Sequence, residues 1–83
     1  MLPAKAVNQA PKYRYAVLSV VRTSQIAELE SSCEAEGDAD RMFRMEYSRW
    51  GLTDTNYYLV DWKEQRVIKS HIATDSGPSG GKT

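Results

Sequence analysis

The stretch 56–73 constrains the fold most, because its residue pattern is typical of a β-hairpin. The runs 56–61 and 66–73 are rich in aromatic and β-branched residues, which favour extended strands. Between them, the residues 62–65 are polar apart from Trp62, as expected of a turn. The sequence therefore predicts two antiparallel strands joined by a tight turn, and the rest of the chain must pack against them.

A four-residue turn also fixes which residues of the two strands face each other. One pair is of opposite charge and two pairs are apolar, a good match for cross-strand neighbours. These pairs are Asp61 with Arg66, Val60 with Val67, and Leu59 with Ile68. The same turn places Gln65 at a left-handed position, where glycine or asparagine is the usual residue.

Composition indicates one small domain with a single core. The chain has 83 residues, of which 41% are hydrophobic and 27% charged, and this is too apolar for disorder throughout. A chain of this size buries only about 60% of the surface that its unfolded form exposes, so we expect modest stability or stability shared with a second subunit. Eleven basic and eleven acidic side chains cancel, which excludes the globally basic surface of a non-specific nucleic-acid binder.

Cysteine usage and the N-terminal sequence predict a soluble cytoplasmic protein. The single cysteine, Cys33, cannot form an internal disulfide or a zinc cluster, which favours a reducing compartment. Residues 1–11 contain no apolar run of signal-peptide length, and no stretch of the chain is apolar for long enough to cross a bilayer.

Two more elements follow from the first half of the chain. Residues 12–21 predict a strand with apolar side chains on both faces, and such a strand belongs in the middle of a sheet. Residues 24–36 predict a short amphipathic helix, because their apolar residues recur at helical spacing. Thr23 or Ser24 offers an N-cap for this helix, and Gly37 offers its C-terminal stop.

The segment 41–50 fits two periodicities. Its aromatic and methionine residues alternate with polar ones as in a strand, yet several also share one face of a helix. We favour a strand and keep a helix as the alternative. The predicted fold is then α+β, a mostly antiparallel sheet of three to four strands with one helix packed on one face, in the order β-α-β-β-β. This domain covers 12–73, between a flexible leader (1–11) and a flexible tail (74–83).

No residue pattern predicts catalysis, a cofactor or a metal site. The tail ends in Gly-Lys-Thr but has one residue too few between its glycines for a phosphate-binding P-loop. The only histidine, His71, has no second ligand or nucleophile at a local spacing. We therefore expect a non-enzymatic protein.

An acidic segment is the first feature that suggests a partner. Residues 23–40 contain six acidic side chains and no lysine or arginine, and several of the acids stand four apart, which destabilises a helix. Because local stability does not favour this arrangement, the segment is a candidate docking surface for a basic partner; a merely solvated face is the alternative. The candidate contact residues in it are Glu30, Glu34 and Asp38.

Trp62 is the second candidate contact. It lies at the predicted hairpin tip between charged residues, where a large ring is hard to bury against its own core, and tryptophan is enriched at interface hot spots. The alternative is that the ring folds back across the sheet onto Tyr58 or the aliphatic stem of Lys69. With the acidic segment, Trp62 predicts a protein-interaction module that occupies a partner's surface. By analogy, this suggests a viral protein, a phage or mobile-element accessory protein that inhibits a host nucleic-acid-binding complex.

Two other functions remain open. Rings and cations on a sheet face can stack bases, which predicts a binder of single-stranded nucleic acid, RNA above all. The residues that would form this face are Tyr13, Tyr15, Arg44, Tyr58, Lys69 and His71. The small core and the sheet edges that need covering also fit a structural homodimer.

Overall fold

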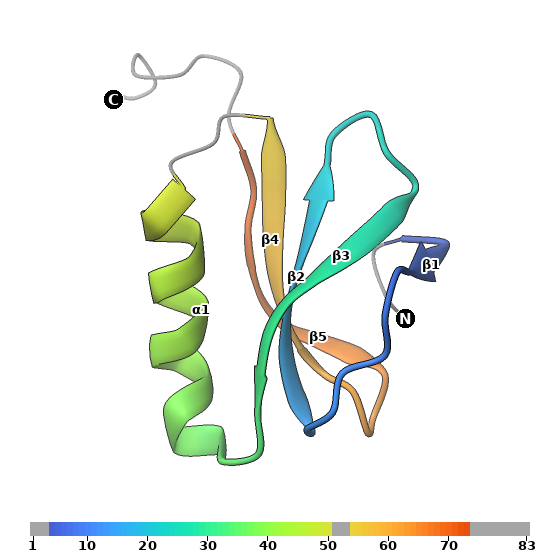
Figure 1. Ribbon diagram of the computed structural model, residues 1–83. Helices are drawn as coiled ribbons and strands as arrows, with labels where there is room; N and C mark the ends of the chain where they lie inside the picture. The colour runs from blue at the N-terminus through green and yellow to red at the C-terminus, as the bar shows by residue number, and fades with distance from the viewer. Residues whose placement is uncertain (1–3, 51–53, 74–83) are drawn as a thin grey trace.

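The structure, a computed structural model, describes residues 4–50 and 54–73. Along the chain its elements are β1 (Ala6–Val7), β2 (Tyr15–Val21), β3 (Ile26–Cys33), α1 (Glu36–Trp50), β4 (Thr55–Asp61) and β5 (Arg66–His71). The strands form one five-stranded sheet in the order β1-β3-β2-β4-β5, and α1 lies along one face of it (Figure 1). Every pairing is antiparallel except that of β1 with β3. The predicted α+β class, with one helix on a mostly antiparallel sheet, is confirmed.

Strand β2 is the centre of the sheet, as its sequence predicts. It pairs with β3 on one side and with β4 on the other, and all six residues from Tyr15 to Val20 are buried. Because side chains alternate across a strand, β2 contributes to two separate clusters, one on each face of the sheet.

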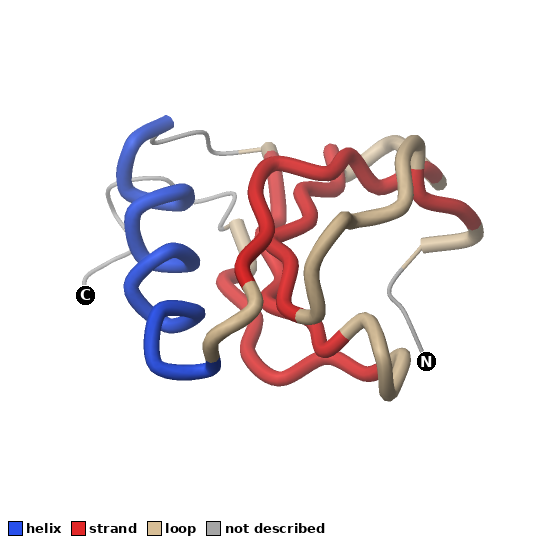
Figure 2. Tube along the Cα trace, turned by 60° about the horizontal axis from the view of Figure 1, so that its bottom comes forward, coloured by secondary structure: helices blue, strands red, loops and turns tan. Residues whose placement is uncertain are grey.

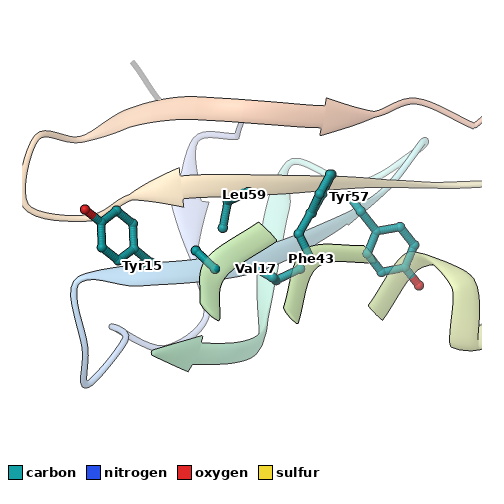
Figure 3. Close-up of a cluster of buried hydrophobic side chains, with 6 residues drawn as sticks. Tyr15, Val17, Phe43, Tyr57 and Leu59 are labelled. Atoms are coloured by element: carbon teal, nitrogen blue, oxygen red, sulfur yellow. The ribbon is translucent and has the colours of Figure 1, made fainter. Parts of the chain in front are cut away.

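The helix-side core lies between α1 and the sheet. It joins Tyr15, Val17, Tyr57 and Leu59 of the strands to Ala39 and Phe43 of the helix (Figure 3). The rings of Phe43 and Tyr47 meet edge to face, with centroids 5.1 Å apart. Each side chain of this kind contributes about 1.5–3 kcal/mol when it is fully buried, so this cluster fixes the helix on the sheet.

The second core lies on the opposite face and consists of Ala16, Leu18, Val20, Ala27 and Val60. Half-buried residues pack against it, among them Ala4 and Val7. Val7 belongs to β1, which pairs with β3 at Ala27, so part of the stretch expected to be a leader lies against the domain. The expected tail, 74–83, lies outside the described residues.

The predicted helix at 24–36 is wrong, because most of this segment forms β3. A helix would place the repelling carboxylates of this segment close together, whereas a strand at this position pairs with β2 and buries Ala27 completely in the second core. Thr23 and Ser24, the two candidates for the N-cap, lie between β2 and β3 instead, and Ser24 holds the turn there. Its backbone N–H donates to the carbonyl of Val21 (2.8 Å), and its hydroxyl accepts from the N–H of Ile26 (3.0 Å).

The preferred strand at 41–50 is also wrong, and the helical alternative holds, since α1 spans Glu36–Trp50. The order of charges explains this outcome: Glu36 and Asp38 lie in the first turn and the arginines follow, which matches the helix dipole. Gly37, expected to stop a helix, lies in this first turn instead. These two changes turn the expected order β-α-β-β-β into β-β-α-β-β, and the short strand β1 at the N-terminal end adds a fifth strand, so that the order is β-β-β-α-β-β.

The predicted hairpin is confirmed as β4 and β5, with one correction to its register. Asp61 faces Arg66 and Val60 faces Val67, and Gln65 has the expected left-handed conformation (φ 56°). Leu59, however, faces Lys69, because Ile68 is the extra residue of a β-bulge. Ile68 is consequently 36% exposed, and Lys69 and His71 take the places opposite Leu59 and Tyr57, on the side of the sheet that α1 covers.

Candidate interaction surfaces

The acidic corner, defined as Glu34, Glu36 and Asp38, lies where β3 turns into α1. All three side chains are exposed. Among the described residues none of the three forms an ion pair. The turn is fixed locally, because the N–H of Asp38 donates to the carbonyl of Ala35 (3.1 Å). The helix dipole lowers the cost of gathering these charges at the start of α1, and a fixed negative surface results.

Glu30, which the sequence grouped with Glu34 and Asp38 as a candidate contact residue, does not belong to the acidic corner. It is half-buried within β3. It is the extra residue of a bulge opposite Val17 and Leu18, and its carboxylate accepts a hydrogen bond from the Ser19 hydroxyl (2.6 Å). Burial raises the pKa of Tyr57, and the charge of Glu30 adds to this shift. The structure thus brings Glu34 and Asp38 together at the acidic corner but gives Glu30 an internal role.

Asp40, one helical turn after Glu36, also has partners inside the domain. Its carboxylate accepts a hydrogen bond from the ammonium of Lys69 in β5 and forms an ion pair with Arg44 of its own helix at 3.2 Å. The hydrogen bond from Lys69 lowers the pKa of Asp40 below its ordinary value. This network ties the helix to the edge strand, and it exists because the bulge in β5 turns Lys69 toward α1.

Cys33 lies at the end of β3, beside the acidic corner. Its thiol is half-buried and 3.5 Å from the carbonyl oxygen of Ala35. Burial raises the pKa of the thiol, and the nearby Asp38 and Glu34 raise it further. The thiolate is the nucleophile and the metal ligand, so these surroundings oppose both roles.

Trp62 begins the turn between β4 and β5 and is half-buried against the second core, on the same side as Tyr58. The backbone N–H of Trp62 donates to the backbone carbonyl of Arg14 (2.7 Å). Asp61, which is 1% exposed, holds the turn in place. Its carboxylate forms a bidentate ion pair with the guanidinium of Arg14, with a shortest N–O distance of 2.9 Å. The same carboxylate accepts hydrogen bonds from the backbone N–H groups of Lys63 and Glu64. Part of the ring is thus used in packing, and the rest faces solvent.

The six residues of the predicted nucleic-acid face lie in different places. Tyr15 is buried in the helix-side core, and Arg44 and Lys69 both bind Asp40. His71 stacks on Tyr47 of α1, with ring centroids 4.0 Å apart. Tyr58 packs against the second core on the opposite face. Tyr13 precedes β2 and is 43% exposed, with the ammonium of Lys12 5.7 Å from its ring.

The side of α1 that points away from the sheet carries, beside Asp38, three residues that were not among the candidates from the sequence. The outer face of α1 is defined as Asp38, Arg41, Met45 and Ser48, all exposed. Met45 is 60% exposed. In the sequence these four residues are spaced three, four and three positions apart, which is the spacing of one face of a helix. The spacing indicates a common face only if 36–50 is helical.

Known proteins offer no guide to these surfaces, because no protein family, curated protein or solved structure matches the chain. In the part of the chain that the structure describes, no three His, Cys, Asp or Glu side chains are grouped so that they could hold a metal ion. Nor does that part contain a helix that is both long and apolar enough to span a membrane. The candidate surfaces must therefore be judged on their own geometry and charge.

Proposed function

We propose that this chain is a non-enzymatic protein-interaction module that binds a basic protein surface through the acidic corner. The observation that carries the proposal is a contrast among the acidic residues. Asp61, Asp40 and Glu30 each have a partner inside the domain. The three carboxylates of the acidic corner, by comparison, pair with no described residue.

Unpaired like charges on a rigid corner favour association with a surface of opposite charge. Such charges raise the association rate and select against other acidic surfaces, and the attraction weakens as salt screens it. Binding of this kind acts by occupancy and needs no chemistry. A small inhibitor of the phage or mobile-element type would work in this way, by covering a nucleic-acid-binding surface of a host protein.

A pull-down from the native cell lysate tests this proposal, with the full chain as bait. Glu34→Gln/Asp38→Asn removes two charges of the acidic corner, and Glu28→Gln/Glu64→Gln removes two exposed charges elsewhere. We expect the first variant to lose the partner and the matched control to retain it, with both equally folded by circular dichroism.

Nuclease treatment of the lysate separates this function from nucleic-acid binding. We expect a protein partner to survive the treatment. Capture that disappears with nuclease, and that depends on Arg44 or Lys69 but not on Glu34 and Asp38, would overturn the proposal in favour of the nucleic-acid alternative.

A further inference from the structure

The outer face of α1 is an uncovered helix surface with an apolar centre. Ala39 and Phe43 turn toward the sheet, so Arg41 and Met45 point away from it. No other described element lies over this side of the helix, which stands as a separate layer beside the strands (Figure 2). Met45 is the most exposed of the large hydrophobic side chains in the described residues, at 60%.

The charge along this surface changes sign from one end to the other. Glu34 lies just before the helix and Asp38 in its first turn, and Arg41 and Arg44 follow three and six residues after Asp38. Among the described residues, neither Asp38 nor Arg41 forms an ion pair. A second copy of the same helix, laid antiparallel, would bring its basic part against the acidic end. A surface that is complementary to itself in this way meets the requirement of a twofold interface.

We infer that a second copy of this chain is one basic partner of the acidic corner, an inference that rests on the proposed function. The two α1 helices pack antiparallel through their outer faces, about a twofold axis that passes between the levels of Asp38 and Arg41 along the helix. Asp38 of one protomer then faces Arg41 of the other, twice in each dimer. Met45 of each protomer lies over the start of the other helix, beside the exposed Ala35.

The size of this interface makes the dimer weak. A helix of 15 residues is about 22 Å long, and the helices overlap over only part of that length. One helix pair buries less area than the roughly 1,200 Å² at which stable interfaces begin. We therefore expect dimer at high protein concentration and low salt, and monomer under dilute or salty conditions.

Sedimentation equilibrium of the full chain over a concentration series at low salt tests the inference, with two charge reversals. In the proposed dimer, Asp38→Arg brings two arginines together at each contact between protomers, and Arg41→Asp brings two aspartates together there. Each variant alone should therefore dimerise at least roughly tenfold more weakly than the wild type. An equimolar mixture should recover the wild-type affinity, because the heterodimer contains both opposite-charge contacts. Damage within a single chain could not be repaired by mixing, so recovery identifies the contact itself.

Glu28→Arg, an exposed reversal on β3, is the control and should leave the dimer intact. A wild-type chain that stays monomeric at every concentration, or a mixture of the two reversals that does not recover, would overturn the inference. Equal weakening by Glu28→Arg would also overturn it, because the effect would then follow net charge. If the chain is monomeric while the lysate pull-down still depends on Glu34 and Asp38, the second-copy inference fails and the proposed function stands.

Discussion

Replacing Phe43 by alanine tests whether α1 is correctly placed, because this ring joins the helix to the sheet. Phe43 is 4% exposed and lies in the helix-side core, edge to face with Tyr47. Removing a buried phenylalanine typically costs about 3–5 kcal/mol through lost burial and the cavity left behind. A domain of this length has only about 4–12 kcal/mol of stability to lose. We therefore expect Phe43→Ala to shift the urea midpoint far down or to unfold the chain.

Met45→Ala is the matched control, and it distinguishes a helix from a strand. In a strand, Phe43 and Met45 would share one face, and both substitutions would be costly. In α1 they lie on opposite sides, and Met45 is 60% exposed, so Met45→Ala should change the free energy of unfolding by less than about 0.5 kcal/mol. Urea titrations at low micromolar protein keep the proposed dimer dissociated. Similar losses in both variants would refute the helical assignment.

Three further outcomes follow from the hairpin. The hydrogen-bonded Arg14 holds the pKa of Asp61 below its ordinary value. A carboxylate of this kind stabilises the fold fully above its unfolded pKa of about 3.9 and loses that contribution as pH falls through the folded value, so Asp61→Asn should flatten the acid side of a stability-pH profile measured by urea titration. Leu59→Ala should cost about 2–4 kcal/mol and Ile68→Ala less than about 1 kcal/mol, since Leu59 is 2% and Ile68 36% exposed; equal costs in urea titrations would contradict the bulge. Trp62→Ala should lower stability by about 2 kcal/mol in urea titrations, because part of the ring packs against the second core. The pull-down tests separately the sequence-based prediction that Trp62 is a contact residue, and unchanged capture by the folded variant would contradict that prediction.

Elements rich in β-branched and aromatic residues could be predicted from the sequence. The run 15–21 is apolar on both faces and the hairpin strands carry many such residues, so these strands, and two of the three hairpin pairs, were predictable. The left-handed conformation of Gln65 followed from the turn length alone. The bulge at Ile68 did not, because it depends on how Lys69 and His71 meet a helix that lies elsewhere in the chain.

The two wrong assignments have a common cause. In both segments the spacing of the apolar residues fits a helix as well as a strand, and contacts with the rest of the domain determine which of the two forms. Ile26, Leu29 and Cys33 stand at helical spacing, yet Ala27 and Leu29 also share one side of a strand and pack together in the second core. In 36–50 both periods fit the apolar residues, and the order of charges along the helix was the stronger signal. Once that helix is assigned, 24–36 is the remaining candidate to pair with β2.

The position of part of the candidate surface could be anticipated from the sequence, and its role in binding stays a prediction. The excess of acidic residues in 23–40 does correspond to a surface, the acidic corner, and it contains Glu34 and Asp38. Glu30 could not be separated from them, because its internal role comes from a bulge that turns it toward Ser19. The outer face of α1 was hidden by the strand assignment of 41–50.

An NMR titration of the isotope-labelled chain with the protein recovered from the lysate tests the central claim most directly. The central claim is that the acidic corner contacts the partner, so the amide shifts should be largest at residues 34–38 and should shrink when salt is raised. The same titration with Glu34→Gln/Asp38→Asn should give small shifts at every residue. Shifts centred on β4 and β5, with the amides of 34–38 unchanged, would contradict the account.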